Sequence, residues 1–388
     1  MTCAPRFAWL LRAQLTDLTP LPTGPVPRSR LLFGFLKGGF RRSRAGAYEA
    51  LISRSGDNGQ GKTSLLEALY FVAVTRSFRA EKLESVIQEG QEFASVRAKI
   101  QDGDHTREQR AVLGHKERTV LLDGKKPERL ATYATRTPAV VFHPGDVELV
   151  NEGAAARRKL LDRVGLYVDP YSGDARLRYT RALRERKVAL DLRGPQAREL
   201  PAFEQVMAEH GSRFARARRE AAERLLSALV PAFLRMAQPG LELQAKYRPG
   251  GSVDPAEFAA ELAARRARDC RQRAASFGPQ RDDLQLFVDG RSARHHASQG
   301  QQRILTLALK VAELECVREA RHAHPVLLLD DVSSELDPAR TGAVYDFLRE
   351  TQSQVFVTTT RPELFPTPGV SGLERADWQL VSGALAQL

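Results

Sequence analysis

The fold of this chain is decided by one stretch, Gly56-Asp57-Asn58-Gly59-Gln60-Gly61-Lys62-Thr63, which Ser64 follows directly. It matches the pattern G-x-x-x-x-G-K-[ST], which is typical of a phosphate-binding loop. The glycines let backbone N–H groups surround a β-phosphate, Lys62 can bridge the β- and γ-phosphates, and the Thr63 hydroxyl can ligate Mg²⁺. Apolar spacing from Ser64 to Thr75 predicts a helix whose positive end faces the anion. The stretch therefore predicts an ATP site.

A second acidic motif lies far downstream, where the apolar run Val326–Leu329 ends in Asp330 and Asp331. Such a run is typical of a parallel strand buried on both faces, and ligands bind at the carboxyl ends of such strands. Asp330 can hold Mg²⁺ through water, and Asp331 can polarise an attacking water as a general base. With Lys62, these two aspartates are the predicted catalytic residues.

A third motif, Ser298-Gln299-Gly300-Gln301-Gln302, opens a predicted helix that runs from Gln301 to Arg321. The Ser298 hydroxyl and the free N–H groups beside Gly300 and Gln301 would suit a γ-phosphate. We expect the motif to complete the nucleotide site of a partner subunit, because it should lie far from its own phosphate loop. The simpler alternative is an N-cap serine.

The long separation of the motifs predicts an insertion, and residues 146–270 carry helical spacing. The fold class we predict is α/β, an ABC/SMC-type P-loop ATPase head with an inserted helical arm. The domains expected are an irregular N-terminal segment (1–48), in which no apolar strand stands out, the N-terminal half of the head (49–145), the helical arm (146–272) and the C-terminal half of the head (273–388).

Composition favours a polyanionic partner, since the 388 residues include 59 Lys+Arg against 47 Asp+Glu, a formal net charge of +12. Membrane headgroups or RNA would explain that charge equally well. The three cysteines show no metal-ligand or redox spacing, which fits a cytoplasmic protein. No apolar run reaches the ~18–20 residues of a membrane span, so no membrane association is expected.

Basic residues of the arm are candidates for contact with DNA phosphates, with weak sequence specificity. The alternative is a solvated helix face whose arginines pair with neighbouring carboxylates. The candidates are Arg157, Arg158, Lys159, Arg178, Arg181 and Arg184.

Taken together, these motifs closely resemble the RecF family of DNA replication and repair proteins. The resemblance covers residues 50 to 365 or so and rests on a few blocks of sequence. The blocks are Gly56–Ala68, Arg157-Arg158 with Leu161-Asp162, Gly278–Leu284, Ser298–Arg303 with Leu307–Lys310, Leu328–Asp337 and Thr358–Thr360. In ABC-type heads, Ser333–Asp337 is where the chain crosses the dimer interface, and Thr358–Thr360 is where the γ-phosphate is sensed.

The resemblance implies an ATP-dependent homodimer, slow ATP hydrolysis with Mg²⁺, and binding to single- and double-stranded DNA at gaps. It also implies a role in the SOS response and partnership with RecR and RecO in loading the RecA recombinase. The chain departs from the family at Pro144-Gly145-Asp146, where Pro-Glu-Asp is usual, and at Gln280, where His is usual. Residues 1–55 also lack the strands with which the family opens.

Two other functions share part of this pattern. An ABC-type ATPase subunit of another machine has the phosphate loop and the Ser-x-Gly motif, but it would be shorter and would lack the arm. A DNA clamp could use ATP only as a switch, since Thr358–Thr360 replaces the histidine of fast ATPases. We therefore expect weak ATPase activity, below the ~10 s⁻¹ median for enzymes.

Overall fold

The structure is a computed structural model. It describes residues 9–14, 50–54, 61–80, 82–88, 90–102, 105–115, 117–237, 240–331, 353–359, 375–381 and 384–387. The predicted loop residues Gly56–Gln60 and the predicted interface residues Ser333–Asp337 lie outside these ranges, as does Thr360. The chain divides into two compact units, residues 1–146 with 322–388, and residues 147–321.

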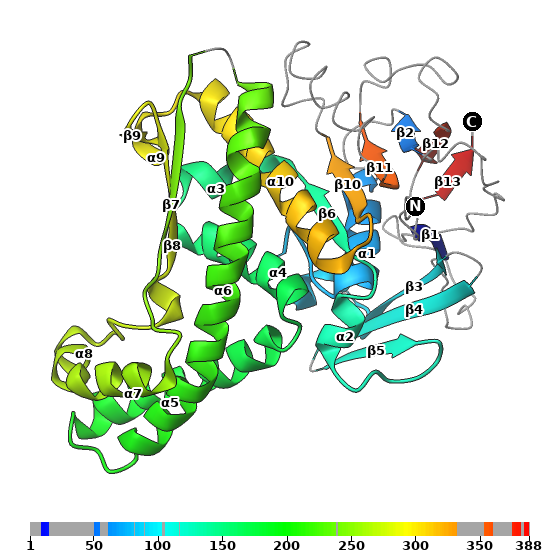
Figure 1. The fold of residues 1–388 in the computed structure, drawn as a ribbon. Coiled ribbons are helices and arrows are strands. Elements are labelled where there is room, and N and C mark those ends of the chain that lie inside the picture. The colour runs from blue at the N-terminus through cyan, green and yellow to red at the C-terminus, as the bar shows by residue number, and fades with distance from the viewer. Residues whose placement is uncertain are drawn as a thin grey trace, which may run out of the picture. The chain divides into compact units, whose positions relative to one another are not determined.

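The first unit contains a largely parallel sheet with the strand order β13-β12-β2-β11-β10-β6 (Figure 1). Its strands are β2 (Ala50–Arg54), β6 (Ala139–Phe142), β10 (Val326–Asp330), β11 (Val355–Thr358), β12 (Arg375–Val381) and β13 (Ala384–Gln387). Only the β12–β13 pair is antiparallel among these described strands. All five residues of β10 are buried, which confirms the predicted parallel strand at Val326–Leu329.

A second, antiparallel sheet of the same unit has the order β1-β3-β4-β5. Its strands are β1 (Trp9–Gln14), β3 (Phe93–Asp102), β4 (His105–Gly114) and β5 (Arg118–Leu122). The expectations of no strand in residues 1–48 and of no opening strands in residues 1–55 are wrong, because Trp9–Gln14 pairs along the whole of its length with β3 and Ala50–Arg54 pairs with β11. Each pairing joins segments far apart in sequence, and it depends on a partner strand rather than on local spacing.

Helix α1 (Lys62–Val74) packs between the two sheets and forms the centre of this core. Leu66, Phe71 and Val72 are almost fully buried, in contact with a cluster that includes Ile100 of β3 and Leu328 of β10. Apolar side chains therefore surround α1 on several sides, as expected of a helix without a polar face. The short elements η1 (Leu83–Val86), α2 (Leu130–Ala134) and η2 (Pro144–Val147) complete the unit.

The second unit is built around α6 (Leu200–Met236), which packs against α4 (Ala154–Val168), α5 (Ser172–Arg193) and α10 (Gln299–Arg321). Figure 1 shows α6 as the long green helix of this unit. The predicted helical segments within residues 154–236 are confirmed. The shorter helices are α3 (Glu148–Asn151), α7 (Pro255–Ala264), α8 (Arg266–Gln272), η3 (Pro279–Arg281) and α9 (Ala293–His296).

The same unit also holds a small antiparallel sheet of order β7-β8-β9. Its strands are β7 (Leu243–Arg248), β8 (Asp283–Val288) and β9 (Arg291–Ser292). The sequence predicts only helix in residues 146–272, so the prediction misses strand β7. Asp289 and Gly290 connect β8 to β9 with φ values of 50° and 73°, as is typical of a tight Asp-Gly turn.

The compact units do not test the predicted division into head halves and arm, which stays a prediction. Among the described helices, none combines the length and the apolar character needed to cross a bilayer. Cys316 is buried, and burial raises the pKa of its thiol to about 12, so this cysteine stays protonated and unreactive.

Candidate functional site

The described end of the phosphate loop leads directly into α1. Gly61 caps the helix with φ 96° and ψ 10°, a left-handed conformation that favours glycine. Its carbonyl accepts the first helical hydrogen bond, 3.0 Å from the amide N of Leu65. Lys62 and Thr63 are the first residues of the helix, so they stand at its positive end. The chain therefore presents these side chains where a phosphate would be held.

Asp330, the last residue of β10, is hydrogen-bonded to the start of α1. The Thr63 hydroxyl donates to Asp330 Oδ1 over 3.0 Å, across 267 positions of sequence. Thr358 lies opposite Asp330 in the parallel register of β11, and its hydroxyl donates to the same oxygen at 2.8 Å. The two residues predicted to hold Mg²⁺ are thus brought together.

Asp331 follows β10 in the left-handed region, with φ 48°. Its amide N donates to the carbonyl oxygen of Thr358 at 3.1 Å, which fixes the turn at the end of the strand. A left-handed aspartate is unusual and is held there by its surroundings. The geometry thus sets Asp331 immediately beside Asp330, and its role as general base stays a prediction.

The oxygen atoms at the end of β10 fit a hard cation such as Mg²⁺, which prefers oxygen ligands. Because the Thr63 hydroxyl gives its proton to Asp330, its lone pairs remain available to a cation. Both side-chain hydrogen bonds of Asp330 to described residues end on Oδ1, so Oδ2 can accept from metal-bound water. The donor set therefore agrees with the predicted ATP–Mg²⁺ chemistry.

Ser298 caps α10 in the second unit. Its hydroxyl accepts a hydrogen bond from the Gln301 amide N at 3.2 Å, and its own amide donates to Gln301 Oε1 at 2.8 Å. This reciprocal pair is a capping box, so the N-cap interpretation describes the local structure correctly. The hydroxyl acts as an acceptor here and can still donate its proton to a phosphate oxygen. Completion of a partner's site by Ser298, Gly300 and Gln301 stays a prediction.

A buried ion-pair cluster holds α10 against α4. Arg163 Nε lies 2.6 Å from Glu313 Oε1, and Lys310 Nζ lies 2.5 Å from Glu313 Oε2. Burial raises the pKa of the Glu313 carboxyl, but the charges of Arg163 and Lys310 and their hydrogen bonds lower it overall to about 2. Glu313 is therefore ionised throughout the physiological range.

Two of the basic residues proposed from sequence are engaged inside the protein. Arg157 is buried, its Nε lies 2.9 Å from Asp283 Oδ1, and its Nη1 donates to the carbonyl of Leu149. Arg158 donates to the carbonyl of Asp282 at 3.0 Å. Their placement on the candidate DNA surface is therefore not supported by the structure. Lys159, Arg178, Arg181 and Arg184 are exposed and keep that candidacy.

The block Gly278–Leu284 is explained by packing within the second unit. Arg218 of α6 donates to Asp162 Oδ1 of α4 at 2.6 Å and to Asp282 Oδ2 at 3.1 Å. Gly278 has φ 121°, and an added Cβ would lie 2.1 Å from the hydroxyl of Tyr179. The block therefore fastens α4, α5 and α6 to the start of β8, a role that the motif alone does not reveal.

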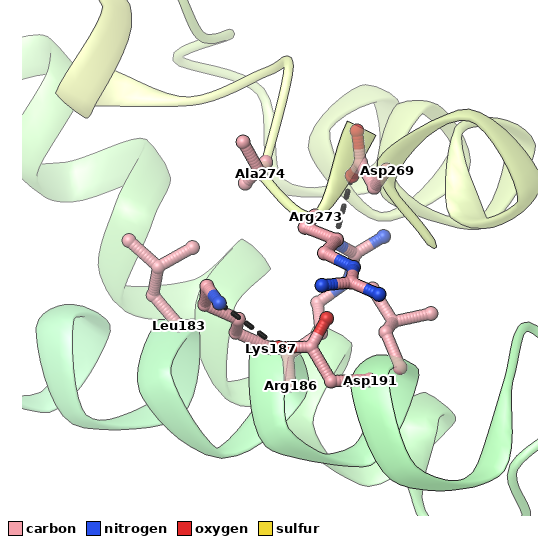
Figure 2. A pocket seen from close by; sticks show the side chains of 9 residues that line it. Leu183, Arg186, Lys187, Asp191, Asp269, Arg273 and Ala274 are labelled. Carbon is pink, nitrogen blue, oxygen red and sulfur yellow. Dashed lines mark hydrogen bonds and ion pairs between the residues drawn. The ribbon is translucent and has the colours of Figure 1, made fainter. Parts of the chain in front are cut away.

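Figure 2 shows a small polar pocket between α5 and the segment after α8, with Lys187 and Arg273 on its wall. Lys187 pairs with Asp191 at 2.9 Å, and the buried Arg186 pairs with Asp269 at 2.8 Å and with Glu204 at 3.0 Å. The ion pairs of Arg186 connect α5 to α6 and α8.

The chain is similar in sequence to a family of known proteins. The chain matches the family model described as RecF/RecN/SMC N terminal domain over residues 46–369. It is 38% identical to the DNA replication and repair protein RecF of Anaeromyxobacter sp. (strain Fw109-5), covering 86% of this chain and 92% of that protein. It is 37% identical to the RecF of Geobacter sulfurreducens, covering 79% and 85%.

Solved structures agree with the sequence relatives. The structure of the recombination mediator protein RecF-ATP in the RecFOR pathway superposes with a TM-score of 0.76, at 26% identity. That match covers 88% of this chain and 92% of the other. The corresponding RecF-ATPrS structure gives a TM-score of 0.75. The likeness therefore extends over both compact units.

Proposed function

The chain belongs to the RecF family of DNA replication and repair proteins, and from this we propose that ATP binding switches it into a DNA-bound dimer. The observation that carries the proposal is the hydrogen-bonded set of Thr63, Asp330 and Thr358 at the carboxyl ends of parallel strands. Together with the Ser298 cap on α10, it supports the proposal of two half-sites that form one composite nucleotide site in a dimer.

In this proposal each residue has a defined chemical task. Lys62 and the N-terminus of α1 hold the phosphates, while Thr63 and Asp330 hold Mg²⁺. When bound, Mg²⁺ would neutralise the negative charge of the phosphates. Asp331 accepts a proton from the attacking water. We expect hydrolysis by this set to be slow, below the ~10 s⁻¹ median for enzymes.

Ser298 should contribute to dimerisation more than to nucleotide binding. We expect Ser298→Ala to leave ATP binding by the monomer within about twofold, and to raise the dissociation constant of the ATP-dependent dimer at least tenfold, roughly one charge-assisted hydrogen bond. The measurement is sedimentation velocity with and without ATP and Mg²⁺, with duplex DNA in a parallel run. DNA is expected to strengthen the wild-type dimer.

A second variant separates capping from phosphate contact. Alanine at an N-cap also costs about 1 kcal/mol of helix stability, whereas aspartate caps as well as serine. Ser298→Asp keeps the cap but places a carboxylate where a phosphate is expected, so it should prevent dimerisation without destabilising the protein. An unchanged dimer in both variants would exclude the composite site.

The exposed row Arg178, Arg181 and Arg184 is proposed to track DNA phosphates, because residues three apart share one helix face. Replacing all three with alanine should weaken DNA binding equally for all DNA sequences. The negative slope of log Kobs against log salt concentration should become shallower by about 2–3. The matched control removes Arg198, Arg268 and Arg271, which are also exposed arginines of this unit. Equal slopes for both triple variants would place the DNA surface elsewhere.

Partners and pathway belong to the same proposal. The matched structures are of a mediator in the RecFOR pathway, which supports RecR and RecO as partners in loading RecA at gaps. A role in the SOS response and a cytoplasmic location stay predictions. The alternative of a pure DNA clamp predicts the same dimer with no turnover, so phosphate release during the sedimentation series distinguishes the two.

A further inference from the structure

The Thr358 hydroxyl occupies a position between the two carboxylate residues of the site. It donates its proton to Asp330 Oδ1 at 2.8 Å, and it lies 3.3 Å from the amide N of Asp331, from which it accepts. Thr358 is only 3% exposed, and its strand β11 pairs residue by residue with β10. One buried hydroxyl thus contacts both the residue proposed to hold the metal and the residue proposed as general base.

These bonds determine the geometry of each aspartate differently. In Asp330 they act on the side chain, because Thr358 and Thr63 donate to the same oxygen and together fix the plane of the carboxylate. In Asp331 they act on the backbone, which is left-handed at φ 48° and whose amide is close to both the carbonyl and the hydroxyl oxygen of Thr358. Without the hydroxyl, the Asp330 carboxylate could rotate about its hydrogen bond to Thr63. The Asp331 amide would keep only the Thr358 carbonyl oxygen as its acceptor.

We propose that Thr358 is a positioning residue for the magnesium site, which acts by orienting the Asp330 carboxylate toward Thr63 and by holding the turn at Asp331. Its hydroxyl donates to Asp330 at 2.8 Å and also lies 3.5 Å from the carbonyl oxygen of Leu329, and the γ-phosphate-sensing role predicted for Thr358–Thr360 stays a prediction. The inference rests on the proposed function, because it assigns a residue to that same ATP–Mg²⁺ site.

The expected consequence concerns the metal rather than the nucleotide. A hydrogen bond to a charged group contributes enough to change an equilibrium constant about tenfold or more. Thr358→Val keeps the shape of the side chain and removes the hydroxyl. It should raise about tenfold the free Mg²⁺ concentration that gives half of the Mg²⁺-dependent change in nucleotide binding. The ATP affinity in EDTA should stay within twofold of the wild type. Thr358→Ser restores the hydroxyl and should return the wild-type midpoint.

The test measures binding of a fluorescent ATP analogue to the full-length protein, first in EDTA and then at rising Mg²⁺. Thr135→Val is the matched control, because Thr135 is also buried and its hydroxyl donates to a backbone carbonyl, that of Ala131, at 2.9 Å. That control should leave the Mg²⁺ midpoint unchanged. Urea unfolding of every variant reports any loss of stability, and Thr358→Ala substitutes for Thr358→Val if the latter does not fold.

Each result decides the proposal. A raised midpoint in Thr358→Val, with rescue by serine and no shift in Thr135→Val, supports the positioning role. A wild-type midpoint in Thr358→Val, or equal shifts in Thr358→Val and Thr135→Val, overturns it. Wild-type protein that binds the analogue without any response to Mg²⁺ overturns the proposed magnesium site itself, which is a separate failure from that of Thr358.

Discussion

Replacing Lys62 with alanine is expected to weaken ATP binding at least about a hundredfold, the largest effect we predict at the site. Two charge-assisted hydrogen bonds of about 1.5–3 kcal/mol each would be lost with the ammonium group. Lys62 stands at the first position of α1, directly after the left-handed Gly61, so the helix presents its side chain to any phosphate held in the loop. The measurement is equilibrium titration with a fluorescent ATP analogue in the presence of Mg²⁺.

The fold should survive this change, since Lys62 is only partly buried and alanine is a good helix former. Lys82→Ala is the control, because Lys82 is an exposed lysine of the same unit that lies just before η1. The salt-dependent contact of the Lys62→Ala monomer with DNA should persist, as it depends on arginines of the other unit, whereas the strengthening of DNA binding by ATP should be lost. An ATP affinity within threefold of the wild type would show that the loop does not hold the phosphates as proposed.

Local patterns predicted much of this architecture. The apolar helix after the loop motif, the run Val326–Leu329 and the arm helices each follow from spacing within a short window, and the structure confirms them. The loop residues Gly56–Gln60 lie outside the described residues. The Asp-Gly pair at 289–290 likewise adopts positive φ at both residues. Such features need no knowledge of distant partners, because backbone preferences and one-sided burial act locally.

Other features depend on long-range partners or on signals that were present but weak. Strand β1 exists because it pairs with β3. The sequence of residues 9–14 alone does not indicate this pairing. Strand β7 has an alternating pattern of exposure that its sequence Leu-Gln-Ala-Lys-Tyr-Arg could have suggested. Arg157 shares a helical face with the buried Leu160, Leu161 and Val164, so its spacing pointed inward even though its charge suggested the surface.

The residues of the site also fall into those that a local motif identifies and those that only the fold identifies. The sequence identifies Thr63 and Asp330 as a pair by motif, and the structure brings their oxygens within 3.0 Å. No motif identifies Thr358 as the residue that bonds both neighbouring aspartates, because this follows from strand register between β10 and β11. Residues that bind a ligand have recognisable patterns, whereas residues that orient them are found by geometry.

Glu313→Gln is expected to destabilise the protein by about 3 kcal/mol at pH 7, because the shift of its pKa from 4.5 to about 2 measures the stabilisation of its charged form. The variant leaves the buried ammonium of Lys310 and the guanidinium of Arg163 without their carboxylate. Urea unfolding followed by circular dichroism gives the free energy of unfolding of both proteins.

The pH dependence has a definite sign. Because the folded pKa lies below the unfolded one, the stabilisation is fully present above pH 4.5 and is lost as the pH falls toward 2. The difference between wild type and Glu313→Gln should therefore fall to less than about half of its neutral value by pH 3. Glu319→Gln, an exposed change on the same helix, should differ from wild type by less than about 0.5 kcal/mol.

Removal of the Lys310 charge tests the cause of this stabilisation. The double variant Lys310→Met with Glu313→Gln removes the buried ammonium together with the carboxylate that it pairs with, so it should be more stable than Glu313→Gln alone. If the double variant is the less stable of the two, Glu313 contributes through packing rather than through its charge. A pH-independent gap between wild type and Glu313→Gln would lead independently to the same conclusion, since only an ionised carboxylate links stability to pH.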